Sequence, residues 1–385
     1  RSAAKASRTK KGLLRANGTR IVWLHSIHGS FRFPLRRFKD EFGELTDFIA
    51  LTGPIDNGIS HRLAEEVCYL ANRLSFAELE HCVTRRRGID LSVMTLHRIV
   101  QRAAQDVEDI GKQAIADTIH RSLPPLVPTE ESDLYDPGVE EVIVMEDGIL
   151  AKAQKAQRKP GCKRKTRFIA TDFATLQRPD GRYSRVSESL VRGESESFGV
   201  SDSLRAAFIR HWSGQPGPLR VVALTDGARC IRQHLTEVFG VFVFIVLDWY
   251  HLTKKLQVLL SQVCFGNAHR KSVQRQMQGH LWRGDVKRAL AVLDALKARK
   301  PEKSAELRKY LVKHASEIID YGRRQEAGKV VGSGRMEKTV DQTVALRQKR
   351  KGMSWTEQGS RALSALRIVE LNGMWDEFWE AKAAA

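Results

Sequence analysis

Three acidic residues have the chemistry and the sequence setting of a metal-dependent phosphoryl-transfer site. Asp147 closes the apolar run of Val-Met-Glu-Asp-Gly, Asp226 closes that of Leu-Thr-Asp-Gly, and Glu337 follows Gly-Ser-Gly-Arg-Met. Carboxylates gathered at strand ends repel one another, and divalent cations between them would remove that repulsion. Two Mg²⁺ ions about 3.5–4 Å apart activate a nucleophile and neutralise a phosphodiester. We therefore predict that Asp147 bridges two Mg²⁺ ions, for which Mn²⁺ can substitute, with Asp226 on one and Glu337 on the other.

An aspartate and a histidine that could also take part in chemistry follow the next apolar run. Asp248 and His251 are one helical turn apart in Asp-Trp-Tyr-His. One interpretation is a helix cap with a local hydrogen bond, and the other places the pair at the rim of the metal site. Zinc is not expected, because no further Cys/His pair supplies two more ligands and no two of the five cysteines form a Cys-x-x-Cys pair.

The order of the expected elements explains how the aspartates would meet. Apolar and alternating patterns predict strands and helices in the order strand 141–147, strand 166–173, strand 182–191, helix 197–212, strand 219–226, helix 228–239, strand 241–248 and helix 250–263. This is the order of an α/β, ribonuclease-H-like mixed sheet, in which the first and fourth strands are neighbours. Asp147 and Asp226 would then be neighbours too.

The predicted core is completed by the last part of the chain. After the first part of the core, 141–263, a polar segment with a helical pattern and no strands, 264–325, is expected to be an insertion. The final part, 326–385, contains a helix that opens at Glu337 and continues over 338–371. Glu326 lies one glycine-containing segment upstream and is an alternative third carboxylate. Trp282, in the insertion, is either a core residue or a platform that stacks on an unpaired base.

The N-terminal region has a different pattern. Residues 1–20 form a predicted basic arm, and 21–120 a DNA-binding region that starts with a hairpin around His28-Gly29. Three predicted helices, 60–74, 75–86 and 92–105, place a helix-turn-helix at about 60–105. An ordinary helical bundle is the alternative. Residues 121–140, rich in proline and acids, are expected to be a linker.

The charge of the chain favours nucleic acid as its partner. The 64 Lys and Arg exceed the 45 Asp and Glu by 19, and such an excess attracts polyanions, although membranes and ribosomes attract basic proteins as well. No apolar run is long enough for a membrane span. The residues expected to contact DNA are Arg85, Arg86, Arg87, Ser92, Thr95, His97 and Arg98 in the helix-turn-helix, Lys155, Arg158, Lys159, Lys163, Arg164 and Lys165 in the loop after Leu150, and Arg347, Lys349, Arg350 and Lys351 downstream of Glu337.

Taken in order, these motifs resemble the DDE transposases of bacterial insertion sequences, in the Mutator-related, ISKra-type branch. The resemblance covers about 140–380 through Glu-Asp-Gly at 146–148, Thr-Asp-Gly-Ala at 225–228, Asp-x-x-His at 248–251, the insertion, and Gly-Ser-Gly-x-x-Glu at 332–337. A weaker likeness extends to Pro54-Ile55-Asp56, to 75–79 and to 92–102. Some relatives carry cysteine pairs before that segment, and this chain has none there.

The resemblance implies a DNA recombination enzyme with endonuclease and strand-transfer activity. Such an enzyme binds the terminal inverted repeats of its element and cuts a strand at each end. The freed 3′-hydroxyl then attacks target DNA, with Asp147, Asp226 and Glu337 as the catalytic carboxylates. A homodimer or larger assembly on DNA is expected, in the bacterial cytoplasm at the nucleoid, without a membrane partner or a small-molecule substrate. The alternatives are a structure-selective nuclease or resolvase on the same fold, and a non-catalytic, domesticated DNA-binding protein.

Overall fold

The structure, a computed structural model, describes residues 15–39, 42–47, 55–56, 58–155, 166–188 and 198–384. The chain divides into two compact units. The first takes its described residues from 1–110, 151–169 and 343–385, and the second from 111–150 and 170–342. These boundaries differ from the predicted segments, because 326–385 is shared between the two units.

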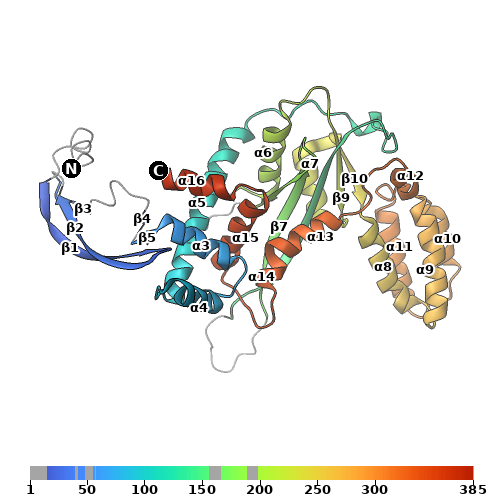
Figure 1. Cartoon of the computed structure of the whole chain (residues 1–385). Coiled ribbons are helices and arrows are strands. Elements are labelled where there is room, and N and C mark those ends of the chain that lie inside the picture. Colours follow the sequence, from blue (N-terminus) through green and yellow to red (C-terminus); the bar gives the residue numbers. More distant parts are fainter. Residues whose placement is uncertain are drawn as a thin grey trace. The chain divides into compact units, whose positions relative to one another are not determined.

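The second unit is built on a mixed five-stranded sheet (Figure 1). Its strands lie in the order β10-β9-β6-β7-β8, where β6 is Glu141–Lys152, β7 Phe168–Gln177, β8 Tyr183–Ser187, β9 Arg220–Thr225 and β10 Val243–Leu247. Strand β9 runs parallel to β6 on one side and to β10 on the other, whereas β7 and β8 are antiparallel. The predicted mixed α/β architecture and the adjacency of the first and fourth strands of this sheet are confirmed.

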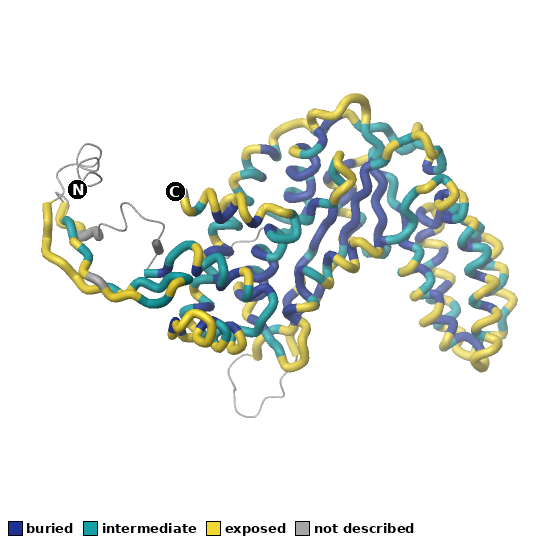
Figure 2. Tube along the Cα trace, in the orientation of Figure 1, coloured by how far each residue is buried: buried dark blue, intermediate teal, exposed yellow. Residues whose placement is uncertain are grey.

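Helices cover both faces of this sheet. Helices α6 (Val200–Trp212) and α7 (Arg229–Phe239) bury one apolar face, where Val144 and Ala223 meet Leu204 and Leu235. On the opposite face, Met336 of α13 (Gly334–Val340) lies 3.7 Å from the Thr175 hydroxyl of β7. Because β9 is covered on both sides, its sequence Arg-Val-Val-Ala-Leu-Thr is almost continuously apolar. The sheet is the buried layer between these helices (Figure 2).

Several predicted boundaries in this unit were wrong, including those of β7, which was predicted over 166–173 and spans Phe168–Gln177. Strand β6 does not end at Asp147 but continues to Lys152, because Ile149 and Ala151 keep the alternation of buried and exposed residues. Strand β8 ends at Ser187, and 189–197 lie outside the described residues. Helix α6 begins at Val200 instead of residue 197.

The segment 264–325 is helical, as expected for the predicted insertion. After α8 (Trp249–Val263) come α9 (Asn267–Trp282), α10 (Val286–Asp294), α11 (Pro301–Lys313) and α12 (Tyr321–Glu326). The Trp282 ring packs against Trp249 and Tyr321, with centroid distances of 4.8 and 5.9 Å, and these two rings also contact each other. This fits the core interpretation of Trp282, and base stacking by this residue stays a prediction.

The first unit combines a small sheet with helices. Strands β1 (Arg15–Ser26) and β2 (Gly29–Lys39) form the predicted hairpin, which is longer than expected and begins inside the predicted basic arm. Residues 1–14 lie outside the described residues. Short strands β3 (Leu45–Asp47), β4 (Ile55–Asp56) and β5 (Ile59–Ser60) complete the order β3-β2-β1-β5-β4.

Three helices follow the hairpin in the places where the helix-turn-helix was predicted. They are α3 (His61–Ala71), α4 (Phe76–Arg87) and α5 (Val93–Ile119). Ser75 and Glu78 form a capping box at the start of α4, and Gly88 ends it in the left-handed conformation. Helix α5 runs 14 residues beyond the predicted end at Gln105, since its helical pattern continues to Ile119. The helices pack with α15 (Glu357–Leu371) and α16 (Trp375–Ala384) around one apolar cluster.

The predicted continuous helix over 338–371 is interrupted. Helix α13 passes into a π-helical turn, η3 (Asp341–Ala345), and the short α14 (Leu346–Gln348). The chain then leaves the helix, with Gly352 at a φ of +86°, before α15 begins. The break explains how the two units share this segment.

Candidate active site

Three aspartates lie at one level of three adjacent parallel strands. Asp147 lies within β6, just past its last pair with β9, whereas Asp226 and Asp248 come directly after β9 and β10. The last pairs in register are Met145 with Leu224 and Leu247 with Thr225. Continued past the ends of the pairing, this register sets Asp226 opposite Asp147 on one side and opposite Asp248 on the other. The Asp248 amide also donates to the Thr225 carbonyl at 2.7 Å, which extends the pairing to Asp248. Residues opposite one another in a sheet share a face, so these carboxyl groups belong to one edge of the second unit.

The third predicted carboxylate, Glu337, lies at the start of the helix that Asp248 holds through Ser333. It is an exposed residue in the first turn of α13, and its charge acts on Asp147. The pKa of Asp147 is raised first by burial and then by the negative charges of Asp226 and Glu337, against the hydrogen bond from the Gly148 amide and the charge of His251. Burial is the largest cause of this raised pKa, and the like charges add to it. A shared site of Asp147, Asp226 and Glu337 stays a prediction.

Asp248 is the buried anchor of this edge. Its side chain is 0% exposed, and Oδ1 accepts from the His251 amide at 2.7 Å as the N-cap of α8. Its other oxygen, Oδ2, accepts from the amide of Ser333, the N-cap residue of α13. Burial alone would raise the pKa of Asp248, but the bonds from His251 and Ser333 bring it below its usual value. One carboxylate thus ties the starts of α8 and α13 together.

His251 turns towards the aspartates from the first turn of α8. Its Nδ1 lies 3.0 Å from Asp248 Oδ1. The pKa of His251 is raised first by this hydrogen bond, while burial lowers it, and then by the charges of Asp248, Asp226 and Asp147. The interpretation as a helix cap with a local hydrogen bond is confirmed, because Asp248 caps α8 and His251 Nδ1 lies beside its carboxylate. A place for the pair at the rim of a metal site stays a prediction.

The glycine after Asp226 is required by the backbone and by close packing. Gly227 has a φ of +82°, and a Cβ there would lie 2.6 Å from His314 Cε1 and 2.9 Å from Leu247 Cδ1. His314 is itself buried, with Nδ1 2.6 Å from Glu317 Oε2, and Arg232 of α7 lies 2.5 Å from the same carboxylate. The end of α11 is therefore fixed against the Asp-Gly turn.

Glu146 and Asp172 are two further acids near the site, and the sequence did not single them out. Glu146 is 3% exposed, its Oε1 lies 2.5 Å from His234 Nδ1, and its Oε2 has no hydrogen-bond partner among the described residues. Burial raises the pKa of Glu146 to about 7; His234 opposes this shift, and the charges of Asp172 and Asp226 add to it. A Cβ on Gly148 would lie 2.7 Å from Asp172 Oδ1. The alternation Glu146-Asp147 was the available signal, since a buried strand seldom holds two adjacent acids.

The donor set fits Mg²⁺ in kind. Asp147, Asp226 and Glu337 offer hard carboxylate oxygens, which Mg²⁺ prefers together with water, and the like-charge effect on Asp147 would be relieved by a cation. Across the described ranges, no three His, Cys, Asp or Glu side chains lie close enough to form a ready-made metal site. The three carboxylates interact but are not drawn together into a closed ligand set.

The residues expected to contact DNA have different environments. Arg85, Arg86, Arg98, Lys155, Lys349, Arg350 and Lys351 are exposed. Arg87 is exposed too and pairs with Glu66 at 2.9 Å. Ser92 accepts from the Thr95 amide as a helix cap, and His97 stacks on Phe76 with ring centroids 3.7 Å apart. The remaining predicted contacts, Arg158, Lys159, Lys163, Arg164 and Lys165, lie outside the described residues.

Arg347 does not fit the prediction of a surface contact. It is 4% exposed, and its Nε donates to the Ala71 carbonyl at 2.8 Å. Its guanidinium lies 4.8 Å from the Trp355 ring centroid, and burial lowers its pKa to about 10. Arg347 is thus a packing residue of the first unit, which corrects its assignment to the DNA track.

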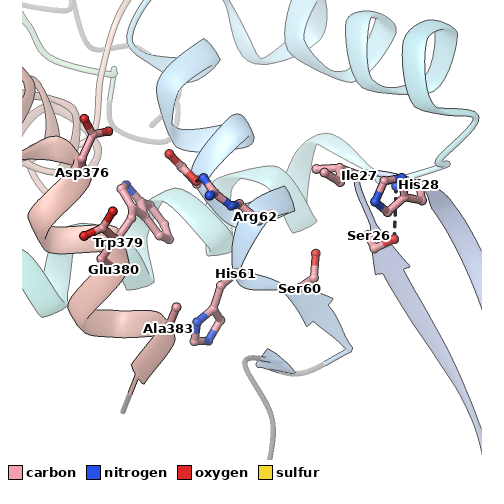
Figure 3. Close-up of a pocket in the computed structure, with 11 residues that line it drawn as sticks. Ser26, Ile27, His28, Ser60, His61, Arg62, Asp376, Trp379, Glu380 and Ala383 are labelled. Atoms are coloured by element: carbon pink, nitrogen blue, oxygen red, sulfur yellow. Dashed lines mark hydrogen bonds and ion pairs between the residues drawn. The ribbon is translucent and has the colours of Figure 1, made fainter.

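A separate pocket of about 350 Å³ lies in the first unit (Figure 3). Ser26 and His28 line it from the hairpin, His61 from α3, and Trp379 and Glu380 from α16. Neither the predicted carboxylates nor His251 line this pocket. No described helix is both long and apolar enough to cross a membrane.

Comparison with known proteins gives two results. Residues 216–382, which are less than half of the chain, match the model of an uncharacterised protein family (UPF0236). The chain is also similar to a solved structure of the Drosophila P element transposase strand transfer complex, at 11% identity and a TM-score of 0.29, over 86% of this chain and 82% of that chain. No curated protein matches. A TM-score at this level does not establish a common fold, so a functional assignment depends on the residues of this chain.

Proposed function

We propose that the protein is a DNA transposase of the DDE type on a ribonuclease-H-like core. The observation that carries the proposal is the strand register, which sets Asp147 opposite Asp226, together with the bond from the Ser333 amide to Asp248 Oδ2, which ties the start of the helix that holds Glu337 to the same edge of the sheet. The strand order β8-β7-β6-β9-β10, with only β9 and β10 added on the far side of β6, supports the fold assignment. The ordered motifs of the sequence support the class.

Under this proposal, Asp147, Asp226 and Glu337 would hold two Mg²⁺ ions, or Mn²⁺ in their place. The bound ions would supply charge neutralisation at the scissile phosphate and acidify the attacking water or hydroxyl. The protein's own residues provide the rest. Asp248 holds the start of α13 through Ser333, and His251 would be a positioning residue that acts through its contact with Asp248.

The partners in this proposal are two DNA molecules. The terminal inverted repeats of the element would be bound through the region of α3 to α5, where Arg85 and Arg86 are exposed at the end of α4. Target DNA would accept the 3′-hydroxyl. Two ends must be held at once, so a dimer or larger assembly on DNA is part of the proposal, at the bacterial nucleoid.

The test measures Mg²⁺-dependent cleavage on the DNA that flanks the gene. Asp147→Ala, Asp226→Ala and Glu337→Ala should each remove 3′-end cleavage, and the triple variant should be no worse than a single one, because residues that act as a unit are not additive. Glu326→Ala, a matched change at the upstream glutamate, should remain active. A fully active single variant at any of the three positions would remove that residue from the site.

Product analysis separates this function from the alternatives. A pre-cut end with a free 3′-hydroxyl should be joined to a second duplex. Cleavage of branched DNA without joining would indicate a resolvase or structure-selective nuclease, and binding without cleavage a non-catalytic protein.

A further inference from the structure

We infer that the β1–β2 ribbon is a duplex-DNA-binding arm, separate from the helices α3 to α5 and from the acidic site. It deepens the proposed function, on which it rests only for the nature of the substrate. The ribbon is a long antiparallel pair (Figure 1), and its outer part is exposed along β1 (Figure 2). Neither the acidic site nor the helix-turn-helix makes use of it.

The ribbon carries charge of one sign. Between residues 1 and 39 the chain has no Asp or Glu. The described part of the ribbon holds Arg15, Arg20, Arg32, Arg36, Arg37 and Lys39. A polyanion neutralises such an array, whereas a second copy of the ribbon would repel it. Charge therefore selects nucleic acid over self-association.

One face of the ribbon interleaves arginine with exposed apolar groups. The register pairs Trp23 with Arg32, Ile21 with Pro34 and Thr19 with Arg36, and directly opposite residues lie on the same face. Ile21 is 60% exposed and Trp23 is 57% exposed. Large apolar groups this exposed mark an interaction surface more than a solvated one. A face built for lipid would segregate its arginines from Trp23, and this one places Arg32 beside it.

The shape of the ribbon selects a duplex. The major groove of B-DNA admits a two-stranded β-ribbon, while the deep major groove of A-form RNA does not. With the ribbon in the major groove, Arg32 and Arg36 would reach phosphates or base edges. Trp23 and Ile21 would pack on sugars and on the methyl groups of thymine. The base of the ribbon is fixed, because the His25 amide donates to the Gly58 carbonyl at 2.7 Å and Arg87 donates to the Ile27 carbonyl.

The experiment titrates the full chain against a fluorescent 30-base-pair duplex in EDTA, at 50 to 150 mM salt. Each phosphate contact contributes about 0.9 to the slope of log affinity against log salt, so Arg32→Ala with Arg36→Ala should lower the slope by about 1.8. The wild type should then lose about sevenfold more affinity than this variant over the threefold rise in salt. Arg32→Lys with Arg36→Lys should keep the slope.

The matched control removes the same charge from the second unit. Arg275→Ala with Arg283→Ala changes two exposed arginines of that unit, and it should alter the slope by clearly less. Trp23→Ala should weaken binding roughly tenfold at every salt concentration without changing the slope. All substituted ribbon side chains are exposed, so unchanged circular dichroism is expected.

Three outcomes would overturn the inference. The first is an equal salt slope for the ribbon variant and the wild type, and the second is a slope that falls as much in the control variant as in the ribbon variant. The third is a changed oligomeric state with unchanged DNA affinity, which would make the ribbon a contact between copies. Tighter binding to single-stranded DNA or to anionic vesicles than to the duplex would also reject it. Because EDTA excludes cleavage, a failed cleavage assay leaves this result intact, and a failed ribbon leaves the acidic site intact.

Discussion

Replacing Asp248 by asparagine should loosen the start of α13 and leave the rest of the second unit intact. Asparagine keeps an acceptor for the His251 amide, so the cap of α8 survives. It replaces Oδ2 by an amide donor that faces the Ser333 amide, which is also a donor. The change therefore removes one bond to a charged acceptor at a site that is 0% exposed.

The size of the effect follows from that lost bond. A hydrogen bond to a charged group contributes about 1.5–3 kcal/mol, and an unsatisfied buried donor costs a similar amount. A local loss of about 2–3 kcal/mol corresponds to roughly 30- to 150-fold faster amide exchange in α13. Native-state hydrogen exchange with mass spectrometry measures this directly over 333–340, with α6 as the internal reference. Cleavage should fall in parallel, because Glu337 lies in the loosened turn.

The control is a second N-cap aspartate. Asp285 caps α10 through the Arg288 amide at 2.9 Å, and its side chain is 30% exposed. Asp285→Asn should change exchange by about twofold or less, since asparagine is as good a cap as aspartate. If Asp248→Asn left exchange over 333–340 at the wild-type rate, the bridge from β10 to α13 would not be what holds Glu337.

Two further predictions concern the packing around the site and the first unit. Gly227→Ala should cost more than about 2 kcal/mol of unfolding free energy, because the alanine meets both a positive φ and His314. The control is Gly88→Ala, at a left-handed helix end with a φ of +64° and no atom within 4 Å of the added Cβ, which should cost about 1–2 kcal/mol. Equal losses in urea unfolding would contradict the packing argument. Burial would raise the pKa of Glu370, but hydrogen bonds from Arg73 and another arginine lower it, so its contribution to stability is present above the unfolded pKa of about 4.3 and is lost as the pH falls through the lower folded pKa. Glu370→Gln should accordingly destabilise the protein at pH 7 and converge with the wild type at pH 3, and a pH-independent difference would reject this assignment.

The positions of the aspartates at the edge of the sheet were predictable because the signals for them are local. The runs that end at Thr225 and Leu247 are apolar on both faces, so the strands, and hence the positions of Asp226 and Asp248, could be read from hydrophobic pattern alone. The order of the elements then placed Asp147 beside Asp226. The choice of Glu337 depended on the Gly-Ser-Gly-x-x-Glu motif. Hydrophobic pattern alone does not distinguish Glu337 from Glu326 as the third carboxylate.

Other features depend on tertiary packing that a pattern does not encode. The Glu146–His234 pair joins a strand to a helix 88 residues later. Glutamate is usually exposed and histidine is intermediate in burial, so the residue types did not indicate that Glu146 is buried against His234. Arg347 looks like its neighbours in a basic run, yet it is buried against Trp355. The boundary between the two units in the C-terminal segment falls within a π-helical turn, for which the sequence gives no reliable sign.

The double role of Asp248 has a consequence for how this chain tolerates change in length. Its two oxygens accept from the amides of His251 and Ser333, near the two ends of the stretch from Trp249 to Gly332. This stretch is therefore a long loop whose two ends are held together by one side chain. The entropic cost of closing such a loop grows only with the logarithm of its length, by about 0.6 kcal/mol of free energy per doubling. We therefore expect that changes in the length of α9 and α10 alter the stability of this chain little and leave the spacing of the acids on either side unchanged.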